Sequence, residues 1–173
     1  MSRLLFALAA LLTLAACGGD EPPATPDPAA PPQTADASAA APPAFDGPPA
    51  EITLTPVGET MAYEQTEFTV QPGQTVRLTF RNTATNATMN HNVVVLAAGA
   101  DANAVGQAAM EAVATDYIPE AMADQILAHT AMAAPGETVT VEFTAPAAGD
   151  YTYICTFPGH FMMMKGVMRV AAA

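Results

Sequence analysis

The chain has 173 residues, with 5 Lys and Arg against 17 Asp and Glu and a formal net charge of −12. Binding to nucleic-acid phosphates depends on a basic surface, so this balance argues against a nucleic-acid partner and favours a basic protein partner. The length allows one domain of ordinary size together with accessory segments.

The first residues have the composition of an export signal. In residues 1–16, Arg3 precedes an apolar run of about a dozen residues, which is the length of a signal-peptide core and too short to span a bilayer comfortably. Residues 14–17 read LAAC and resemble a bacterial lipobox. We therefore predict a signal peptide over 1–16 and lipidation of Cys17. The alternative is an ordinary secretory signal that is cleaved nearby.

Residues 17–49 offer little that could be buried. Ten of the sixteen prolines lie in 18–49, mixed with alanine, and Phe45 is the one large apolar residue of this stretch. Such a composition does not form a core, so we predict a disordered tether that joins the lipid to a domain over 50–173. A spacer without a role would have the same composition.

From residue 50 onward, the sequence acquires the pattern of short strands. Apolar and polar residues alternate, or β-branched and aromatic residues cluster, in six runs. These candidate strands are 52–55, 75–80, 91–96, 138–143, 151–155 and 166–170. The tripeptides QPG at 71–73 and APG at 134–136 are typical of turns. Several short strands separated by turns predict an all-β sandwich or barrel.

The exception to the β pattern is 101–128, which is rich in Ala, Met, Glu and Gln. Its small apolar residues recur at helical spacing, and Asp101 or Asn103 could cap the start of a helix. Pro119 would interrupt one long helix, so we predict a helix near 103–114 followed by a shorter turn. We expect the segment to be a helical insertion in a β fold.

Cys155, His160 and Met164 lie close together in the stretch CTFPGHFMMMKG. A thiolate, an imidazole and a thioether form a soft donor set that favours copper over calcium or magnesium, and the electron-transfer geometry of copper needs a second histidine. His91, at the start of a candidate strand, is the better choice, whereas we expect His129 to be a solvated surface residue. The alternative is that Cys155 is merely a small buried residue.

The spacing Cys-x4-His-x3-Met in this stretch, with the upstream segment MNHNV, resembles the copper-binding segments of the azurin family. The stretches LAHT and PGETVTVEF extend the similarity over residues 50–170. The resemblance implies a cupredoxin-like Greek-key β-sandwich with one inserted helix over 101–128, and one type 1 copper ion as cofactor. The lipobox and the Pro/Ala tether further resemble the lipid-modified azurins of Gram-negative bacteria.

The resemblance also implies a role for individual residues. The copper ligands would be His91, Cys155 and His160 in the equatorial plane, Met164 as the axial ligand, and the backbone carbonyl of Asn90 as a distant contact. Asn90 stands where azurins have glycine. Asn92 matches the residue that ties the two ligand segments together near the cysteine sulfur, and Phe157 would lie beside the site.

An apolar docking patch around His160 is a further implication of the resemblance. Its residues would be Met61, Met89, Phe157, Met162 and Met163. The alternative for Met162 and Met163 is that they fill the core, for which the flexible methionine side chain is well suited.

The function that follows is one-electron transfer through the Cu(II)/Cu(I) couple, with partners such as a c-type cytochrome or a periplasmic reductase. No enzymatic activity is expected, because a copper enzyme needs a second copper site and the chain has only 3 histidines. The alternative is a copper chaperone or buffer. We expect a periplasm-facing lipoprotein, in the outer rather than the inner membrane, because Gly18 and Gly19 lack the aspartate that marks inner-membrane retention.

Overall fold

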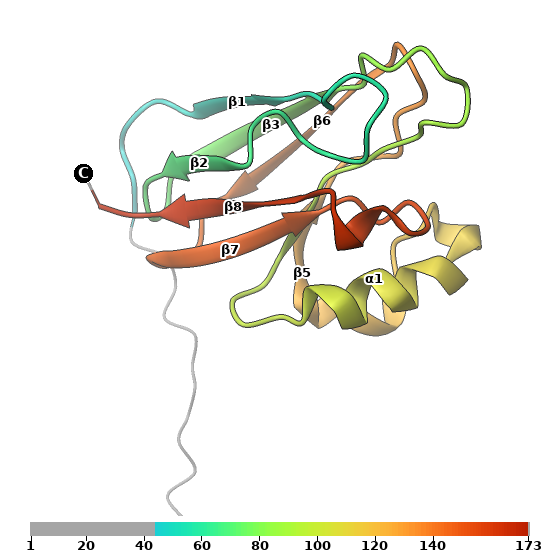
Figure 1. Cartoon of the computed structure of the whole chain (residues 1–173). Coiled ribbons are helices and arrows are strands. Elements are labelled where there is room, and N and C mark those ends of the chain that lie inside the picture. The colour runs from blue at the N-terminus through green and yellow to red at the C-terminus, as the bar shows by residue number, and fades with distance from the viewer. Residues whose placement is uncertain (1–43, 173) are drawn as a thin grey trace, which may run out of the picture. The chain divides into compact units, whose positions relative to one another are not determined.

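The computed structural model of the protein describes residues 44–172. The predicted signal peptide, the lipidation site Cys17 and residues 17–43 of the tether lie outside this range. The described chain forms two β-sheets and a helical insertion (Figure 1). The three-stranded sheet contains, in spatial order, β1 (Ala50–Leu54), β3 (Thr75–Arg81) and β6 (Thr138–Thr144). The five-stranded sheet contains β2 (Glu67–Val70), β8 (Lys165–Val170), β7 (Gly149–Ile154), β4 (Val94–Leu96) and β5 (Ile126–His129).

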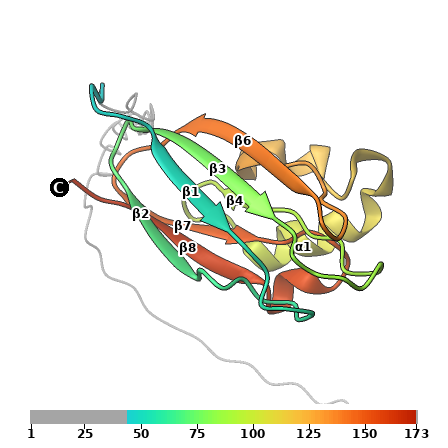
Figure 2. The same ribbon diagram turned by 90° about the horizontal axis from the view of Figure 1, so that it is seen from above.

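The chain crosses repeatedly between the two sheets, although β4 and β5 are consecutive in one sheet, and so are β7 and β8. Strand β1 pairs in parallel with β3, and β2 pairs in parallel with β8, whereas the remaining pairs are antiparallel. Figure 2 looks onto the three-stranded sheet, where β1, β3 and β6 run side by side. Crossings of this kind are typical of two-layered β-sandwiches, and the predicted fold class is confirmed.

The main core lies between the two sheets. In β3 the predicted alternation is realised, because Val76, Leu78 and Phe80 are fully buried while Arg77 and Arg81 are exposed. The same core receives side chains from the opposite sheet and from the loops. Its largest fully enclosed members are Tyr63, Tyr153, Phe80, Leu54, Leu78, Met164 and Met168.

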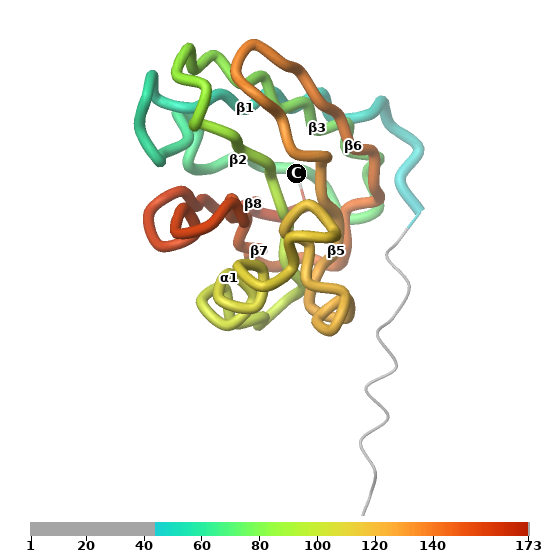
Figure 3. The backbone as a smooth tube through the Cα atoms, turned by 90° about the vertical axis from the view of Figure 1, so that its right-hand side faces the viewer, coloured from blue at the N-terminus to red at the C-terminus, as the bar shows by residue number. Residues whose placement is uncertain are grey.

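The helical insertion connects β4 to β5 and covers the outer face of the five-stranded sheet (Figure 3). It consists of α1 (Ala102–Glu111) and two short 3₁₀ segments, η1 (Val113–Thr115) and η2 (Glu120–Gln125). The side chain of Asp101 accepts hydrogen bonds from two backbone amides of α1, as predicted for a cap. Pro119 precedes η2, in agreement with the predicted interruption.

A second, smaller core joins this insertion to the sheet. Val94, Leu96 and Ile154 from the strands pack there with Val105 of α1 and with Phe161. The predicted insertion over 101–128 extends too far at its end, because residues 126–128 belong to β5. None of the helices among residues 44–172 has both the length and the hydropathy needed to cross a bilayer.

Candidate metal centre

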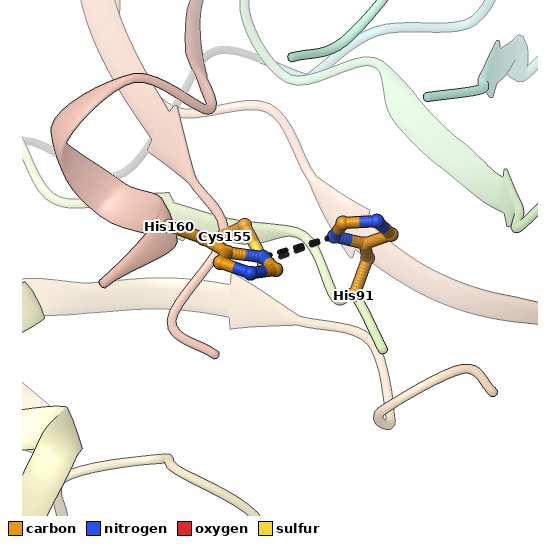
Figure 4. A group of neighbouring side chains, drawn as sticks. All are labelled: His91, Cys155 and His160. Carbon is orange, nitrogen blue, oxygen red and sulfur yellow. Dashed lines mark hydrogen bonds between the residues drawn. The ribbon is translucent and has the colours of Figure 1, made fainter. Parts of the chain in front are cut away.

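Three donor atoms, one from His91 and two from the loop that carries Cys155 and His160, converge in the interior (Figure 4). The Nδ1 atoms of His91 and His160 are 3.1 Å apart, and the Sγ of Cys155 lies 3.8 Å and 3.7 Å from them. Around an ion in the plane of three ligands, with metal–nitrogen and metal–sulfur bonds of about 2.0 and 2.3 Å, such atoms would stand about 3.5–3.8 Å apart. The two sulfur–nitrogen distances match this size and the nitrogen–nitrogen distance is somewhat shorter, so the three atoms are close enough together to share a single metal ion.

Each of these side chains is attached to a different kind of backbone structure: a β-bridge, the end of a strand and a 3₁₀ turn. His91 forms an isolated two-residue bridge with Ala133, with hydrogen bonds of 3.1 and 2.8 Å, just before β4 begins. Cys155 directly follows β7, and its amide donates to the carbonyl of Met164 at 3.0 Å. His160 opens the 3₁₀ turn η3 (His160–Met162), which follows Gly159 with φ of 81°. A positive φ suits glycine, which explains why a glycine occupies position 159 in this tight turn.

Asn92 links the two segments that carry the converging donors. Its Nδ2 donates to Oγ1 of Thr156 at 2.8 Å, and its Oδ1 accepts from the amide of Thr156 at 2.9 Å. The backbone carbonyl of Asn92 accepts a 2.6 Å hydrogen bond from the hydroxyl of Tyr63. All of these groups are buried, so the links are shielded from competing water.

The converging donors are almost completely excluded from solvent. His91 and Cys155 are fully buried and His160 is 6% exposed. Burial raises the pKa of the Cys155 thiol to about 12, although backbone hydrogen bonds from Asn92 and Phe157 act in the opposite direction. Burial, followed by the proximity of His160, lowers the pKa of His91 to about 4, and burial also lowers the pKa of His160. The site therefore offers unprotonated imidazoles and one thiol that a metal can deprotonate.

The three consecutive methionines separate sharply by exposure. Met164 is fully buried, while Met162 is 61% and Met163 is 69% exposed. The amide of Met164 donates to the carbonyl of His160 at 2.8 Å, which holds the backbone of Met164 close to that of His160. Of the other residues expected at the surface around His160, Met61 is 39% exposed, and Met89 and Phe157 are half-buried.

Asn82 is a site residue that the sequence did not single out. Its buried Nδ2 donates to the carbonyls of Met89 and Ala133 at 2.7 and 2.9 Å. Met89 lies two residues before His91, and Ala133 is the bridge partner of His91, so Asn82 holds the segment that contains the half-buried Asn90. A lone asparagine in a loop gives no sequence signal for such a role.

His129 lies outside the converging donors. It is the last residue of β5, its ring is exposed, and its Nδ1 is 3.2 Å from the carbonyl of Thr130. This is the surface position that the sequence predicts for it.

The two ring nitrogens of His91 differ in their surroundings. Nε2 of His91 is enclosed and has no hydrogen-bond partner among the described residues. Nδ1 of His91 is the ring nitrogen that faces the other two donors, so it is the atom that a metal could bind.

The sequence model of the copper binding proteins of the plastocyanin/azurin family matches residues 50–171. The chain belongs to this family. The match covers every strand of both sheets and all three converging donors. The expected family, fold and copper cofactor are therefore confirmed.

Individual members of the family show the same similarity. Auracyanin-A of Chloroflexus aurantiacus is 42% identical over 124 residues, which are 70% of this chain and 75% of that protein. Azurin-1 of Alcaligenes xylosoxydans xylosoxydans is 34% identical over 116 residues, 64% of this chain and 89% of its own. The crystal structure of dithionite-reduced auracyanin from Roseiflexus castenholzii superimposes with a TM-score of 0.66 at 42% identity, covering 73% of this chain and all of that one.

Proposed function

We propose that this protein is a blue copper protein that carries single electrons between redox partners. The observation that supports the proposal best is the buried triangle of two imidazole nitrogens and one cysteine sulfur. Two nitrogens and a thiolate in a plane are the donor set of electron-transfer copper sites. When bound, copper would supply the one-electron couple between Cu(II) and Cu(I).

The residues of this chain would bind the ion and limit how much the site rearranges. Cys155 would lose its thiol proton, and His91 and His160 would donate through Nδ1. The buried thioether of Met164 would be a fourth donor, and the backbone carbonyl of Asn90 a weaker fifth one. Asn92 and its partner Thr156 would keep the two ligand segments in register. Such outer hydrogen bonds orient ligands and tune the metal.

A partner would dock on the apolar surface beside His160. This docking patch consists of Met61, Met89, Phe157, Met162 and Met163. Exposed thioethers and an aromatic ring suit the small and transient interfaces of electron-transfer complexes. The formal charge of −12 favours a basic partner, such as a c-type cytochrome or a periplasmic reductase.

We further propose that the protein is a periplasm-facing lipoprotein of a Gram-negative bacterium, attached to the outer membrane through Cys17. The support is the LAAC motif followed by Gly18 and Gly19. Labelling with radioactive palmitate should mark the natural protein and not Cys17→Ala. Label on both proteins, or on neither, would contradict the anchor.

Copper loading tests the main proposal. The loaded protein should show an intense visible thiolate-to-copper charge-transfer band and a reversible couple in voltammetry. Cys155→Ser should lack the band, whereas His129→Gln, the matched control at the exposed histidine, should keep both features. A retained band in Cys155→Ser, or an irreversible couple in the natural protein, would contradict the proposal.

A copper chaperone or buffer is the second candidate function. Such a protein must release its metal, and the nearly complete burial of His91, Cys155 and His160 opposes rapid release. A chelator competition experiment distinguishes the two functions. Transfer of Cu(I) to a chelator within seconds would favour the chaperone, and retention over hours would favour electron transfer.

A further inference from the structure

The helical insertion contacts the loop between β7 and β8, residues 155–164, on both sides of His160. Phe157 lies three residues before this histidine and Phe161 directly follows it, and each ring meets a different part of the insertion. We infer that the insertion clamps the loop, and that Tyr117 and Gly106 are positioning residues for His160. The inference rests on the proposed role of His160 as a copper ligand.

On one side, Tyr117 reaches His160 through one intervening ring. Its ring meets Phe157 edge to face, with centroids 5.5 Å apart and planes at 72°. Phe157 in turn packs against the imidazole of His160, with centroids 4.9 Å apart. Both separations lie in the favourable range for aromatic pairs. Tyr117 therefore supports the imidazole from the side of the insertion.

The backbone conformation at Tyr117 is unusual and serves this contact. Asp116 and Tyr117 have φ values of 51° and 63°, the only positive values of non-glycine residues within 44–172. Left-handed backbone is unfavourable for side chains with a Cβ and persists where the surroundings impose it. Here the amide of Tyr117 donates to the carbonyl of Ala112 at 2.8 Å, and Oγ1 of Thr115 donates to the carbonyl of Ile118 at 2.6 Å.

On the other side, Gly106 of α1 makes room for Phe161. A Cβ at position 106 would lie only 2.2 to 2.6 Å from three atoms of the Phe161 ring. The ring is 5% exposed and packs in the second core with Val105 and Ile154. Glycine in a helix interior is unfavourable relative to alanine, and the close approach of Phe161 explains why a glycine is present here.

The base of the loop is held independently of the insertion. Asn92 binds Thr156 through two hydrogen bonds, and the amide of Cys155 binds the carbonyl of Met164. The clamp therefore acts on the outer part of the loop, residues 157–163, where His160 is the only candidate ligand.

Hydrogen exchange of backbone amides in the metal-free protein tests this inference. Removing the ring in Tyr117→Leu deletes an aromatic pair whose strength corresponds to about a two- to tenfold change in the local opening equilibrium. We expect amides of 157–163 to exchange faster by that factor, and amides of β3 to be unchanged. Tyr117→Phe keeps the ring, and Val113→Ala alters an exposed side chain of the same insertion. Both controls should exchange like the natural protein.

Gly106→Ala tests the other half of the clamp. The new methyl group forces the Phe161 ring to move, so the same loop amides should lose protection by a similar factor, while amides of α1 keep or gain protection. In the copper-loaded protein, both variants should pass copper to a chelator about two- to tenfold faster, since release requires the loop to open.

Unchanged loop protection in either variant would overturn the role of that residue. Loss of protection that is equal in the loop and in β3 would also overturn it, because that result marks a general loss of stability. The exchange experiment needs no copper. A protein that shows the expected exchange but no reversible couple would refute the proposed function and leave the clamp standing.

Discussion

The thiol of Cys155 is enclosed beside two imidazoles, and burial raises its pKa to about 12. A thiolate at this place without a metal would be an uncompensated buried charge, which is costly. Because burial also lowers the pKa values of His91 and His160, all three donors are uncharged near neutral pH. The metal-free domain can therefore form its site before copper arrives.

Copper binding should release one proton, from Cys155, between pH 7 and pH 10. With a thiol pKa of about 12 and a His91 pKa of about 4, only the cysteine carries a proton to be displaced in that range. Affinity should thus rise about tenfold per pH unit, and fall more steeply near pH 4, where His91 also binds a proton. Calorimetry in buffers of different ionisation enthalpy measures the release. Binding without proton release would exclude Cys155 as a ligand.

Met164→Leu should retain copper and raise the reduction potential. The change replaces a weak electron donor by a hydrocarbon, which disfavours the more highly charged Cu(II). We expect a shift on the order of 60 mV, equivalent to about a tenfold change in relative affinity for a one-electron couple. Voltammetry measures it. Met163→Leu, at an exposed neighbour, is the control, and a shift in the control instead would refute the axial role of Met164.

The sequence predicts the three converging residues, but it does not reveal all the residues that hold them in place. The spacing between Cys155 and His160 is local and chemically distinctive, so it is visible in one stretch. The contact between Asn82 and Met89, and that between Tyr117 and Phe157, depend on how separate loops meet. Asparagine and tyrosine are common in loops, and no spacing marks these two as special.

At the scale of elements, the insertion illustrates what local chemistry can specify. Asp101 caps α1 and Pro119 stands before η2, both as their side-chain chemistry predicts. Strands β2 and β5 were not predicted, because four residues give too few positions for alternation to stand out, whereas the shorter β4 lies in a continuous β-branched run. The sequence of β5, ILAH, continues the alanine-rich composition of the insertion, and only its pairing with β4 makes it a strand.

Asp101→Ala should lower the free energy of unfolding by about 1 kcal/mol, because two amides at the start of α1 lose their acceptor. Urea denaturation of the metal-free protein measures the loss. The control is Asn103→Ala, an exposed residue of the first turn, which should change stability by less than about 0.5 kcal/mol. Equal effects of the two substitutions would show that the cap contributes nothing.

At the scale of the whole molecule, the sandwich core and the site are one continuous structure. Tyr63 packs edge to face on Phe80 in the core, with centroids 6.0 Å apart, and its hydroxyl donates to the carbonyl of Asn92. Phe80 in turn meets the ring of His91 at 6.2 Å. Side chains of the core, rather than solvent-exposed loops, therefore hold His91 in place.

Tyr63→Phe should destabilise the protein by about 1–3 kcal/mol, because a buried carbonyl loses its donor while the core keeps its shape. Urea denaturation provides the measurement. Tyr117→Phe is the matched control, since the hydroxyl of Tyr117 makes no hydrogen bond within residues 44–172. Similar decreases in the free energy of unfolding of the two variants would show that the hydrogen bond from Tyr63 to Asn92 does not stabilise the protein.

The candidate donors, the β-rich class and the capped insertion can be predicted from the sequence, because donor chemistry, alternation and capping each act over a few residues. Only the folded chain shows which methionine is buried, how Asn92 and Asn82 hold the segments of the candidate site, and that the insertion packs on the loop of His160. These features arise where segments far apart in the chain meet, and only the closing of the two sheets over a common core brings them into contact.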